Sequence, residues 1–323
     1  MEGESEQMRV KNTNLHPYPG YEAHVAMNLE TDAGGNVSMR ELQETIKSYR
    51  LGAGTTMHDE MIPGTEPGSQ LKIRIIRPAG LPEKAPMIMD IHGGGYVSGN
   101  LDIDNYRNIS LAEMTPAIVV SVEYRLATRE TPFPAQLMDC RTAYLWLHDH
   151  ASEIGGDPEK IGIHGTSAGG SLSAGLSLYL RDQGEPLPAL TVLMCPGLTL
   201  DQTESKLMFG KLGMPAESYY DEIESIYTAP DGNPVSYYAM PAYCRDLKDL
   251  NPHMIVVAEY DPLRDEGLQY ASRLLSAGVP TEILCAPRVT HGFCVVDQPL
   301  TRWVHRGVAA SFRREFGMRI KEF

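Results

Sequence analysis

The sequence GTSAGG at residues 165–170 places a serine between two different structural patterns. The apolar run KIGIH precedes it, and apolar residues at helical spacing follow it from Ala168 to Arg181. A serine on a sharp turn from strand to helix has an exposed hydroxyl, provided that small neighbours leave room for the turn. The stretch therefore requires a fold in which a strand leads through a tight turn directly into a helix.

Short apolar runs with β-branched residues, bounded by proline and glycine, predict β-strands along the chain. These runs are LKIRIIRP from Leu71, PMIMDI, AIVVSVEY, KIGIH, LTVLMC, HMIVVAEY and TEILCA. Helical spacing separates the later runs at Gln136 to His150, Ala168 to Arg181, Glu266 to Ser276 and Thr301 to Phe316. Strands that alternate with helices predict an α/β fold with a mostly parallel central sheet and helices on both faces.

The 323 residues are expected to form a single domain, because α/β folds commonly hold this length around one core. Residues 1 to about 60 are mixed in character and predict a covering segment with a helix around Met39 to Tyr49. The stretch from Asp201 to Met240, rich in Tyr, Met, Gly and Pro, interrupts the alternation of strands and helices. We interpret it as an insertion that forms part of a lid.

Charge and cysteine pattern exclude several classes of function. A formal net charge of −14 argues against binding to nucleic acid or to an anionic membrane surface, since both select basic patches. No apolar run approaches the roughly 18 residues that span a bilayer, so no stable membrane insertion is expected. The five cysteines form no C-x-x-C pair, and the acidic start MEGESEQMRV does not resemble an export signal, which together favour reduced thiols in the cytoplasm. No residue cluster indicates a metal ion or an organic cofactor.

Ser167 is the predicted nucleophile. The pattern G-x-S-x-G is a weak signal by itself because glycine and serine are common, and the alternative is a plain glycine-rich turn. The position between a strand and a helix favours the chemical interpretation, in which Gly165 and Gly169 leave room for the turn. The helix that starts at Ala168 directs free N–H groups at the place where an oxyanion would form.

The glycine run HGGGY at 92–96 follows the predicted strand PMIMDI and suggests an oxyanion loop. Consecutive glycines allow backbone amides to point at one place, so Gly93 and Gly94 are the expected donors beside Ala168. The two alternatives are a flexible loop and a dinucleotide-binding fingerprint. The fingerprint is disfavoured because Ser98 stands where its third glycine belongs and no helix clearly opens there.

The predicted acid and base come from loops that follow later strands. Asp261 follows the apolar run MIVVAEY, and catalytic groups of open α/β sheets gather at the carboxyl ends of strands. Asp265 is nearer to a helix start, where a carboxylate suits capping and the helix dipole. His291 follows TEILCA and is the predicted base, whereas His253 lies at the opposite end of its strand. The order Ser167, Asp261, His291 is the chain order that this mechanism uses on α/β sheets.

With these motifs the chain resembles the hormone-sensitive-lipase-like branch of the α/β-hydrolases, also called family IV esterases. HGGGY at 92–96, GTSAGG at 165–170, DPLRDEG at 261–267 and HGF at 291–293 occur in the family's order, and the resemblance covers roughly residues 70 to 320. Thr166 is similar to the family's GTSAG subgroup. The resemblance implies a cap built from about residues 1–55 and about 201–245, and dimerisation through the last strand and helix is common in the family.

The motifs and the resemblance together predict a serine carboxylesterase that hydrolyses small-molecule esters of short to medium acyl chains through an acyl-enzyme. An amidase or deacylase would use the same groups, and a non-catalytic small-molecule binder is the third alternative. The lid residues Met208, Met214, Tyr219 and Tyr238, with Tyr96 of the glycine run, suit an adaptable apolar pocket. The alternative is that such side chains only pack the cap against the sheet.

Overall fold

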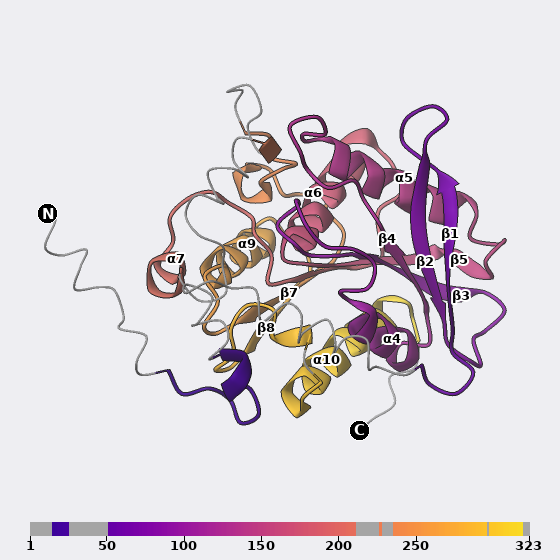
Figure 1. Cartoon of the computed structure of the whole chain (residues 1–323). Coiled ribbons are helices and arrows are strands. Elements are labelled where there is room, and N and C mark those ends of the chain that lie inside the picture. Colours follow the sequence, from indigo (N-terminus) through magenta and orange to yellow (C-terminus); the bar gives the residue numbers. More distant parts are fainter. Residues whose placement is uncertain (1–14, 26–50, 211–225, 228–234, 296, 319–323) are drawn as a thin grey trace, which may run out of the picture.

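An eight-stranded sheet forms the centre of the protein, with the strand order β1-β2-β4-β3-β5-β6-β7-β8 (Figure 1). The structure, a computed structural model, describes residues 15–25, 51–210, 226–227, 235–295 and 297–318. The strands are β1 (Thr56–Pro63), β2 (Gln70–Arg77), β3 (Ala85–Ile91), β4 (Ile118–Val122), β5 (Gly156–Thr166), β6 (Thr191–Met194), β7 (His253–Ala258) and β8 (Thr281–Ala286). β2 pairs antiparallel with β1 and β4, and all other pairs are parallel, as predicted.

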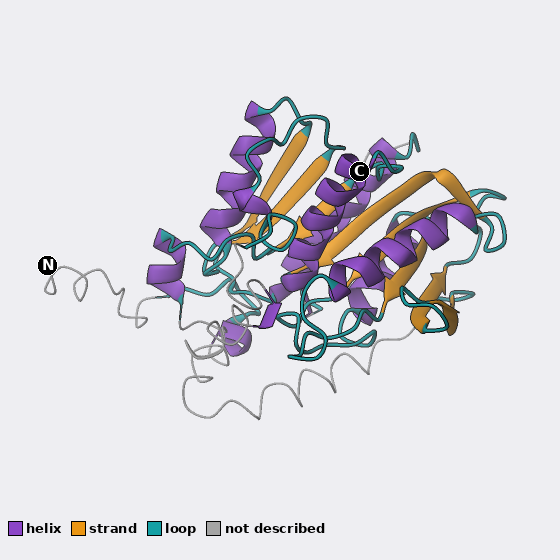
Figure 2. Ribbon diagram, turned by 90° about the horizontal axis from the view of Figure 1, so that it is seen from above, coloured by secondary structure: helices purple, strands orange, loops and turns teal. Residues whose placement is uncertain are grey.

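Helices cover both faces of this sheet and give the molecule three layers (Figure 2). They are α4 (Asn105–Met114), α5 (Ala135–Asp149), α6 (Ala168–Gln183), α7 (Glu204–Phe209), α9 (Arg264–Ser276) and α10 (Pro299–Glu315), with short 3-10 turns η5 (Pro241–Tyr243) and η6 (Phe293–Val295). Helices α5, α6 and α9 lie on one face, and α4 and α10 lie on the other (Figure 1). Among the described residues, we find no helix with both the length and the apolar character that crossing a bilayer demands.

The central strands carry apolar side chains on both faces because helices cover both. In β3, Met87 and Met89 belong to the core beneath α5 and α6, whereas Ile88 belongs to the core beneath α4 and α10. All seven residues of β3 are buried. This double burial explains why the sequence shows continuous apolar runs here instead of alternation.

The order in which successive strands are added to the sheet reverses at β3. The chain passes from β3 to β4 on one side and then crosses to β5 on the other side. At the carboxyl ends of these strands Ile91 of β3 pairs with Gly165 of β5. Open α/β sheets bind ligands in the crevice at such a reversal. The glycine run after β3 and the serine turn after β5 therefore lie side by side.

Strand β1 and helix α4 are among the elements that the sequence pattern does not predict. Strand β1 is exposed along most of its length, so it lacks the apolar alternation of a half-buried strand. Helix α4 buries polar side chains, Arg107, Asn108 and Ser110 among them, so its inner face shows no apolar periodicity. The predicted helices at 136–150, 168–181, 266–276 and 301–316 correspond to α5, α6, α9 and α10. The helix predicted around Met39 to Tyr49 lies outside the described residues.

Residues 15–25 pack beside the carboxyl-terminal part of the domain, near α10 (indigo in Figure 1). The fully buried Tyr21 shares a hydrogen bond of 2.5 Å between its hydroxyl and that of Thr301, and it meets Phe293 edge-on. The Tyr18 amide donates to the Arg288 carbonyl at 2.9 Å. This segment therefore rests on the loop that carries His291.

Candidate active site

Ser167 lies on a strained turn between β5 and α6. Its φ of 57° and ψ of −120° belong to a region that side chains other than glycine rarely adopt. A Cβ on Gly165 would lie 2.1 Å from the Gly169 carbonyl oxygen, and one on Gly169 would lie 2.0 Å from the carbonyl oxygen of Ile91. Only glycine fits at both positions, because the helix backbone meets the strand ends directly. Small residues are therefore needed around the serine because the backbones of the strands and the helix touch there.

The structure brings together the three residues predicted from separate motifs. His291 Nε2 lies 2.9 Å from Ser167 Oγ, and His291 Nδ1 lies 2.8 Å from Asp261 Oδ2. Ser167 follows β5, Asp261 follows β7, and His291 follows β8, so parallel strands deliver all three to one edge of the sheet. Hydrogen-bond distances of this size allow a proton to move between Ser167 and His291.

The surroundings of the His291 imidazole favour its protonated form. Burial lowers its pKa, but the charge of Asp261 and the hydrogen bond from Nδ1 raise it, and Glu266 adds to the rise, so that the pKa lies above the ordinary 6.5. Asp261 is completely buried and is held from its other side, because the Leu263 amide donates to Oδ1 at 2.8 Å. The carboxylate thus has a fixed orientation toward the ring.

The glycine run after β3 approaches Ser167 closely. A Cβ on Gly93 would lie 3.3 Å from Ser167 Cβ. Gly94 has a φ of 124°, and a Cβ there would lie 2.1 Å from the Ser98 carbonyl oxygen. The ring of His92 stacks on Tyr124 at 4.2 Å, and the Tyr124 hydroxyl donates to the His92 carbonyl at 3.0 Å. The loop backbone, and not its side chains, is therefore what faces the serine.

A buried ionic cluster lies beneath the serine turn and was not predicted from the sequence. Arg107 of α4 donates to Thr166 Oγ1 at 2.5 Å, to Asp104 at 2.8 Å and to Asp90 of β3 at 2.6 Å. Burial raises the pKa of Asp90, but the Arg107 charge and the hydrogen bonds from His164 and Asn108 lower it to about 2. The cluster ties α4 to the residue that precedes Ser167. No sequence spacing indicates it, because its members come from distant segments.

Two further neighbours of the site come from segments without a motif. His24 of the N-terminal segment donates from Nε2 to the His291 carbonyl at 3.2 Å. Cys195, directly after β6, offers a sulfur atom that lies within 4.8 Å of ligand atoms of both Asp261 and His291. Burial and the Asp261 carboxylate raise the pKa of this thiol well above its ordinary value. Once deprotonated, this sulfur would form with the carboxylate and the imidazole a set that could hold a metal ion.

The predicted pocket residues lie in varied surroundings. Tyr96 is buried and stacks on Tyr227 with ring centroids 3.7 Å apart. Tyr238 packs edge-on against Tyr179, and its hydroxyl donates to Asp182 at 2.9 Å. Met208 is half-buried in α7. Met214 and Tyr219 lie outside the described residues. Tyr96 and Tyr238 thus pack against neighbours, which is the alternative that the sequence left open.

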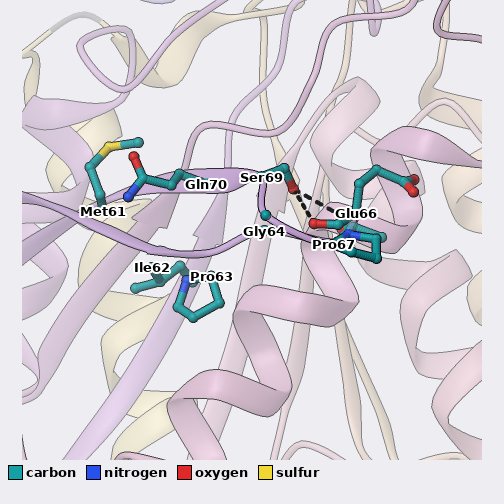
Figure 3. Close-up of a pocket in the computed structure, with 10 residues that line it drawn as sticks. Met61, Ile62, Pro63, Gly64, Glu66, Pro67, Ser69 and Gln70 are labelled. Atoms are coloured by element: carbon teal, nitrogen blue, oxygen red, sulfur yellow. Dashed lines mark hydrogen bonds between the residues drawn. The ribbon is translucent and has the colours of Figure 1, made fainter.

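A hollow of about 500 Å³ lies along the β1–β2 hairpin, lined by residues 61–70 (Figure 3). Its turn is closed on itself, because the Glu66 amide donates to Ser69 Oγ and Ser69 Oγ donates to the Glu66 carbonyl. Strands β2, β4 and β3 separate β1 from β5, which carries Ser167. Ser167 is the stronger candidate for an active site than this hollow, since an imidazole and a buried carboxylate converge at Ser167.

Comparison with known proteins identifies the fold family and the class of enzyme. Residues 88–295 match the family described as having the alpha/beta hydrolase fold. Esterase LipI of Mycobacterium tuberculosis is 35% identical over 76% of this chain and 78% of its own length. An arylesterase of Saccharolobus solfataricus is 35% identical over 66% of this chain and 69% of its own length.

The solved structure of a hyperthermophilic esterase from the archaeon Pyrobaculum calidifontis superposes with a TM-score of 0.81 and 29% identity, over 93% of this chain and 99% of that one. These matches confirm the predicted fold and the predicted class of enzyme, a carboxylic ester hydrolase. The chain belongs to the α/β-hydrolase family, in the branch of esterases similar to hormone-sensitive lipase.

Proposed function

We propose that this protein hydrolyses carboxylic esters with Ser167 as nucleophile, His291 as general base and Asp261 as the group that orients the imidazole. The observation that carries the proposal is the position of His291, 2.9 Å from Ser167 Oγ and 2.8 Å from Asp261 Oδ2. Such a chain of hydrogen bonds activates a serine that is otherwise a weak nucleophile.

In the first half of the reaction Ser167 Oγ attacks the ester carbonyl and its proton passes to His291 Nε2. The imidazolium that results is stabilised by the Asp261 carboxylate. The negative charge on the former carbonyl oxygen is held by the amides of Gly93, Gly94 and Ala168, each donor being worth roughly 3 to 4 kcal/mol. The proximity of the Gly93 backbone to Ser167 and the position of Ala168 at the start of α6 support this assignment.

In the second half the alcohol leaves with the proton from Nε2, and the acyl group stays on Ser167. Water then gives a proton to His291 and attacks the acyl carbonyl, and Nε2 returns the proton to Ser167 as the acid departs. No step of this cycle requires a metal ion or an organic cofactor.

For the substrate, we propose esters of short to medium acyl chains, with aryl esters included. The similarity to an arylesterase supports the same class.

We also propose that the chain is a single domain with a cap from about residues 1–55 and about 201–245, that it belongs to the GTSAG subgroup, and that it is cytoplasmic. A homodimer through β8 and α10 is supported by the exposed side chains of Ile283 and Trp303 on these elements. Sedimentation measurements test the dimer.

The function is tested with a series of p-nitrophenyl esters from acetate to palmitate beside the matching anilides. We expect turnover that peaks at short chains and falls by roughly 10⁶-fold in Ser167→Ala, with unchanged folding. Equal turnover of Ser167→Ala would overturn the assignment of the nucleophile. Faster turnover of the anilides would favour the amidase or deacylase, and a folded protein without activity on either series would favour the binder.

A further inference from the structure

We propose that Cys195, Asp261 and His291 form a binding site for Zn²⁺ that reversibly blocks the serine reaction. The inhibition rests on the proposed function, whereas the binding itself does not. Ligand atoms of the three residues all lie within 4.8 Å of one another. Within the described part of the chain, no other group of three or more His, Cys, Asp and Glu side chains has this geometry.

Three neighbouring parallel strands produce this arrangement. Cys195 follows β6, Asp261 follows β7 and His291 follows β8, and these strands pair in that order. The Cys195 amide donates to the Val256 carbonyl of β7 at 2.7 Å, which fixes the residue against the next strand. Its φ of 47° is unusual for a residue other than glycine. The cysteine is therefore held at the site by the backbone.

The chemistry of the three donors selects zinc. A thiolate, an imidazole nitrogen and a carboxylate oxygen are ordinary Zn²⁺ ligands, at about 2.3, 2.1 and 2.1 Å from the metal. Around a tetrahedral ion such atoms lie roughly 3.4 Å apart. The three ligand atoms here lie within 4.8 Å of one another, and the 2.8 Å between His291 Nδ1 and Asp261 Oδ2 would have to widen when the ion enters. Mg²⁺ and Ca²⁺ prefer sets made of oxygen alone. The positive charge of Zn²⁺ would be balanced by one thiolate and one carboxylate.

Metal binding changes the tautomer of His291. Without the ion, Nδ1 carries the proton shared with Asp261, and Nε2 faces Ser167 Oγ at 2.9 Å with a free lone pair. With the ion on Nδ1, the imidazole proton resides on Nε2, and the Cys195 thiol loses one proton to the solvent. An Nε2–H group can only donate to Ser167, so His291 can no longer accept the serine proton. Inhibition follows although Ser167 is not a ligand.

Access to the site is limited and makes the inhibition slow. Cys195 is 1% exposed and Asp261 is completely buried, whereas the His291 side chain keeps 14% of its surface exposed. The ion must therefore enter past the imidazole, and the ring must move to admit it. We expect time-dependent inhibition that a chelator reverses.

Binding is measured by equilibrium dialysis of Zn²⁺ against Ser167→Ala, which retains all three ligands but lacks the nucleophile. We expect one ion per chain. The double variants with Cys195→Ala or Cys195→Ser should bind at least roughly 10- to 100-fold more weakly, the loss that even an indirect partner of a metal causes. Cys285→Ala is the matched control, because Cys285 is the exposed cysteine. With Co²⁺ as a spectroscopic substitute, a thiolate-to-metal absorption band should appear only when Cys195 is present.

Inhibition is measured on each single variant relative to its own rate without metal. Zn²⁺ should inhibit the wild type and Cys285→Ala but not Cys195→Ala or Cys195→Ser, and Mg²⁺ should inhibit none of them. Equal zinc affinity with and without Cys195, or zinc inhibition that persists in both Cys195 variants, would overturn the proposal. If the esterase proposal failed, zinc binding to Ser167→Ala would still be found, so the two failures are distinguishable.

Discussion

The serine turn and the cap are held in place by different kinds of contact. At the turn, the backbone of α6 at Gly169 meets the backbone of Ile91 so closely that no other residue fits. In the proposed cap, several of the described contacts are made by side chains, such as the stack of Tyr227 on Tyr96 and the ion pair of Lys206 with Glu266 at 3.3 Å. Backbone contacts tolerate almost no substitution, whereas side-chain contacts can be replaced by others. We therefore expect the serine turn to tolerate substitution less well than the side-chain contacts of the proposed cap.

Among the changes that test this comparison, the largest effect is expected from Asp261→Asn, which alters the group that orients His291 without changing its size. The amide oxygen of Asn can still accept from the Leu263 N–H, but its NH₂ group presented to His291 Nδ1 imposes the wrong tautomer. We expect kcat to fall about 10⁴-fold with little change in the free energy of unfolding. Steady-state kinetics and urea denaturation measure the two quantities.

Asp265→Asn is the control for this change. Asp265 lies in the same motif, but its carboxylate contacts the Ser205 amide and Arg264 instead of the imidazole. Its kcat should stay within a few-fold of the wild type. Comparable losses from both substitutions would mean that the motif acts through folding and not through His291.

Gly169→Ala tests the claim that backbone contact fixes the turn. The new methyl group would lie 2.0 Å from the Ile91 carbonyl oxygen and 2.5 Å from that of His92. We expect a loss of about 3 kcal/mol or more in the free energy of unfolding, and loss of activity in the protein that still folds. Urea denaturation followed by circular dichroism measures the change.

Gly307→Ala in α10 is the matched helical control. A Cβ there would meet only Leu284 Cδ1, at 3.3 Å. The higher helix propensity of alanine should offset this contact, so the change should stay within about 1 kcal/mol. If Gly169→Ala were equally mild, the turn would be adaptable and the contrast with the cap would disappear.

The sequence predicts those parts of the site that follow from local pattern and strand direction. Ser167, Asp261 and His291 each follow an apolar run, and parallel strands carry such positions to one edge. Cys195 lies there too, but its proximity to Asp261 depends on β6 pairing with β7, which no local pattern specifies. The sequence does not predict the role of Arg107, because the buried face of α4 carries polar side chains and shows no apolar periodicity. Strand β1 is not predicted because it is exposed.

Tyr227→Ala tests the cap. Tyr227 is fully buried and stacks on Tyr96 with an interplanar angle of 13°. An aromatic pair contributes about 0.5 to 1.5 kcal/mol beyond burial, so kcat/KM should fall by up to about tenfold while kcat at saturation changes less. Tyr227→Phe keeps the stack and removes a hydroxyl for which the described residues supply no hydrogen-bond partner. A loss in Tyr227→Phe as large as in Tyr227→Ala would show that the hydroxyl and not the ring holds the cap.

The smallest expected effect on activity concerns Glu266, which connects the two regions. It is buried at the start of α9, accepts from the Leu198 and Thr199 amides, and pairs with Lys206 of the cap helix α7. Burial raises its pKa to about 7, although Lys206 and the two amides oppose the rise. Its charge in turn helps to raise the pKa of His291. Glu266→Gln should therefore change both the pH profile of activity and that of stability.

For activity, His291 acts as base only in its neutral form, so kcat/KM rises with pH through the pKa of the free enzyme. In the wild type this midpoint should lie above 6.5, because the pKa of His291 is raised. Glu266→Gln removes one negative charge near the ring, and the midpoint should move to lower pH by less than about one unit. A midpoint that moves upward would contradict the electrostatic role assigned to Glu266.

For stability, the raised pKa of Glu266 means that the folded protein binds this proton more tightly than the unfolded chain does. The stability that this proton gives to the folded protein is complete below pH 4.5, the ordinary pKa of a glutamate, and is lost as the pH rises through about 7. The free energy of unfolding of the wild type, measured relative to Glu266→Gln, should thus decline by at most about 3 kcal/mol across that window. Asp59→Asn is a control of opposite sign, because a hydrogen bond from Arg74 lowers the pKa of Asp59, whose contribution is lost only on acidification below 3.8. If the difference in free energy of unfolding between the wild type and Glu266→Gln stayed constant across this window, the carboxyl would be ionised throughout. The ion pair with Lys206 would then outweigh the effect of burial.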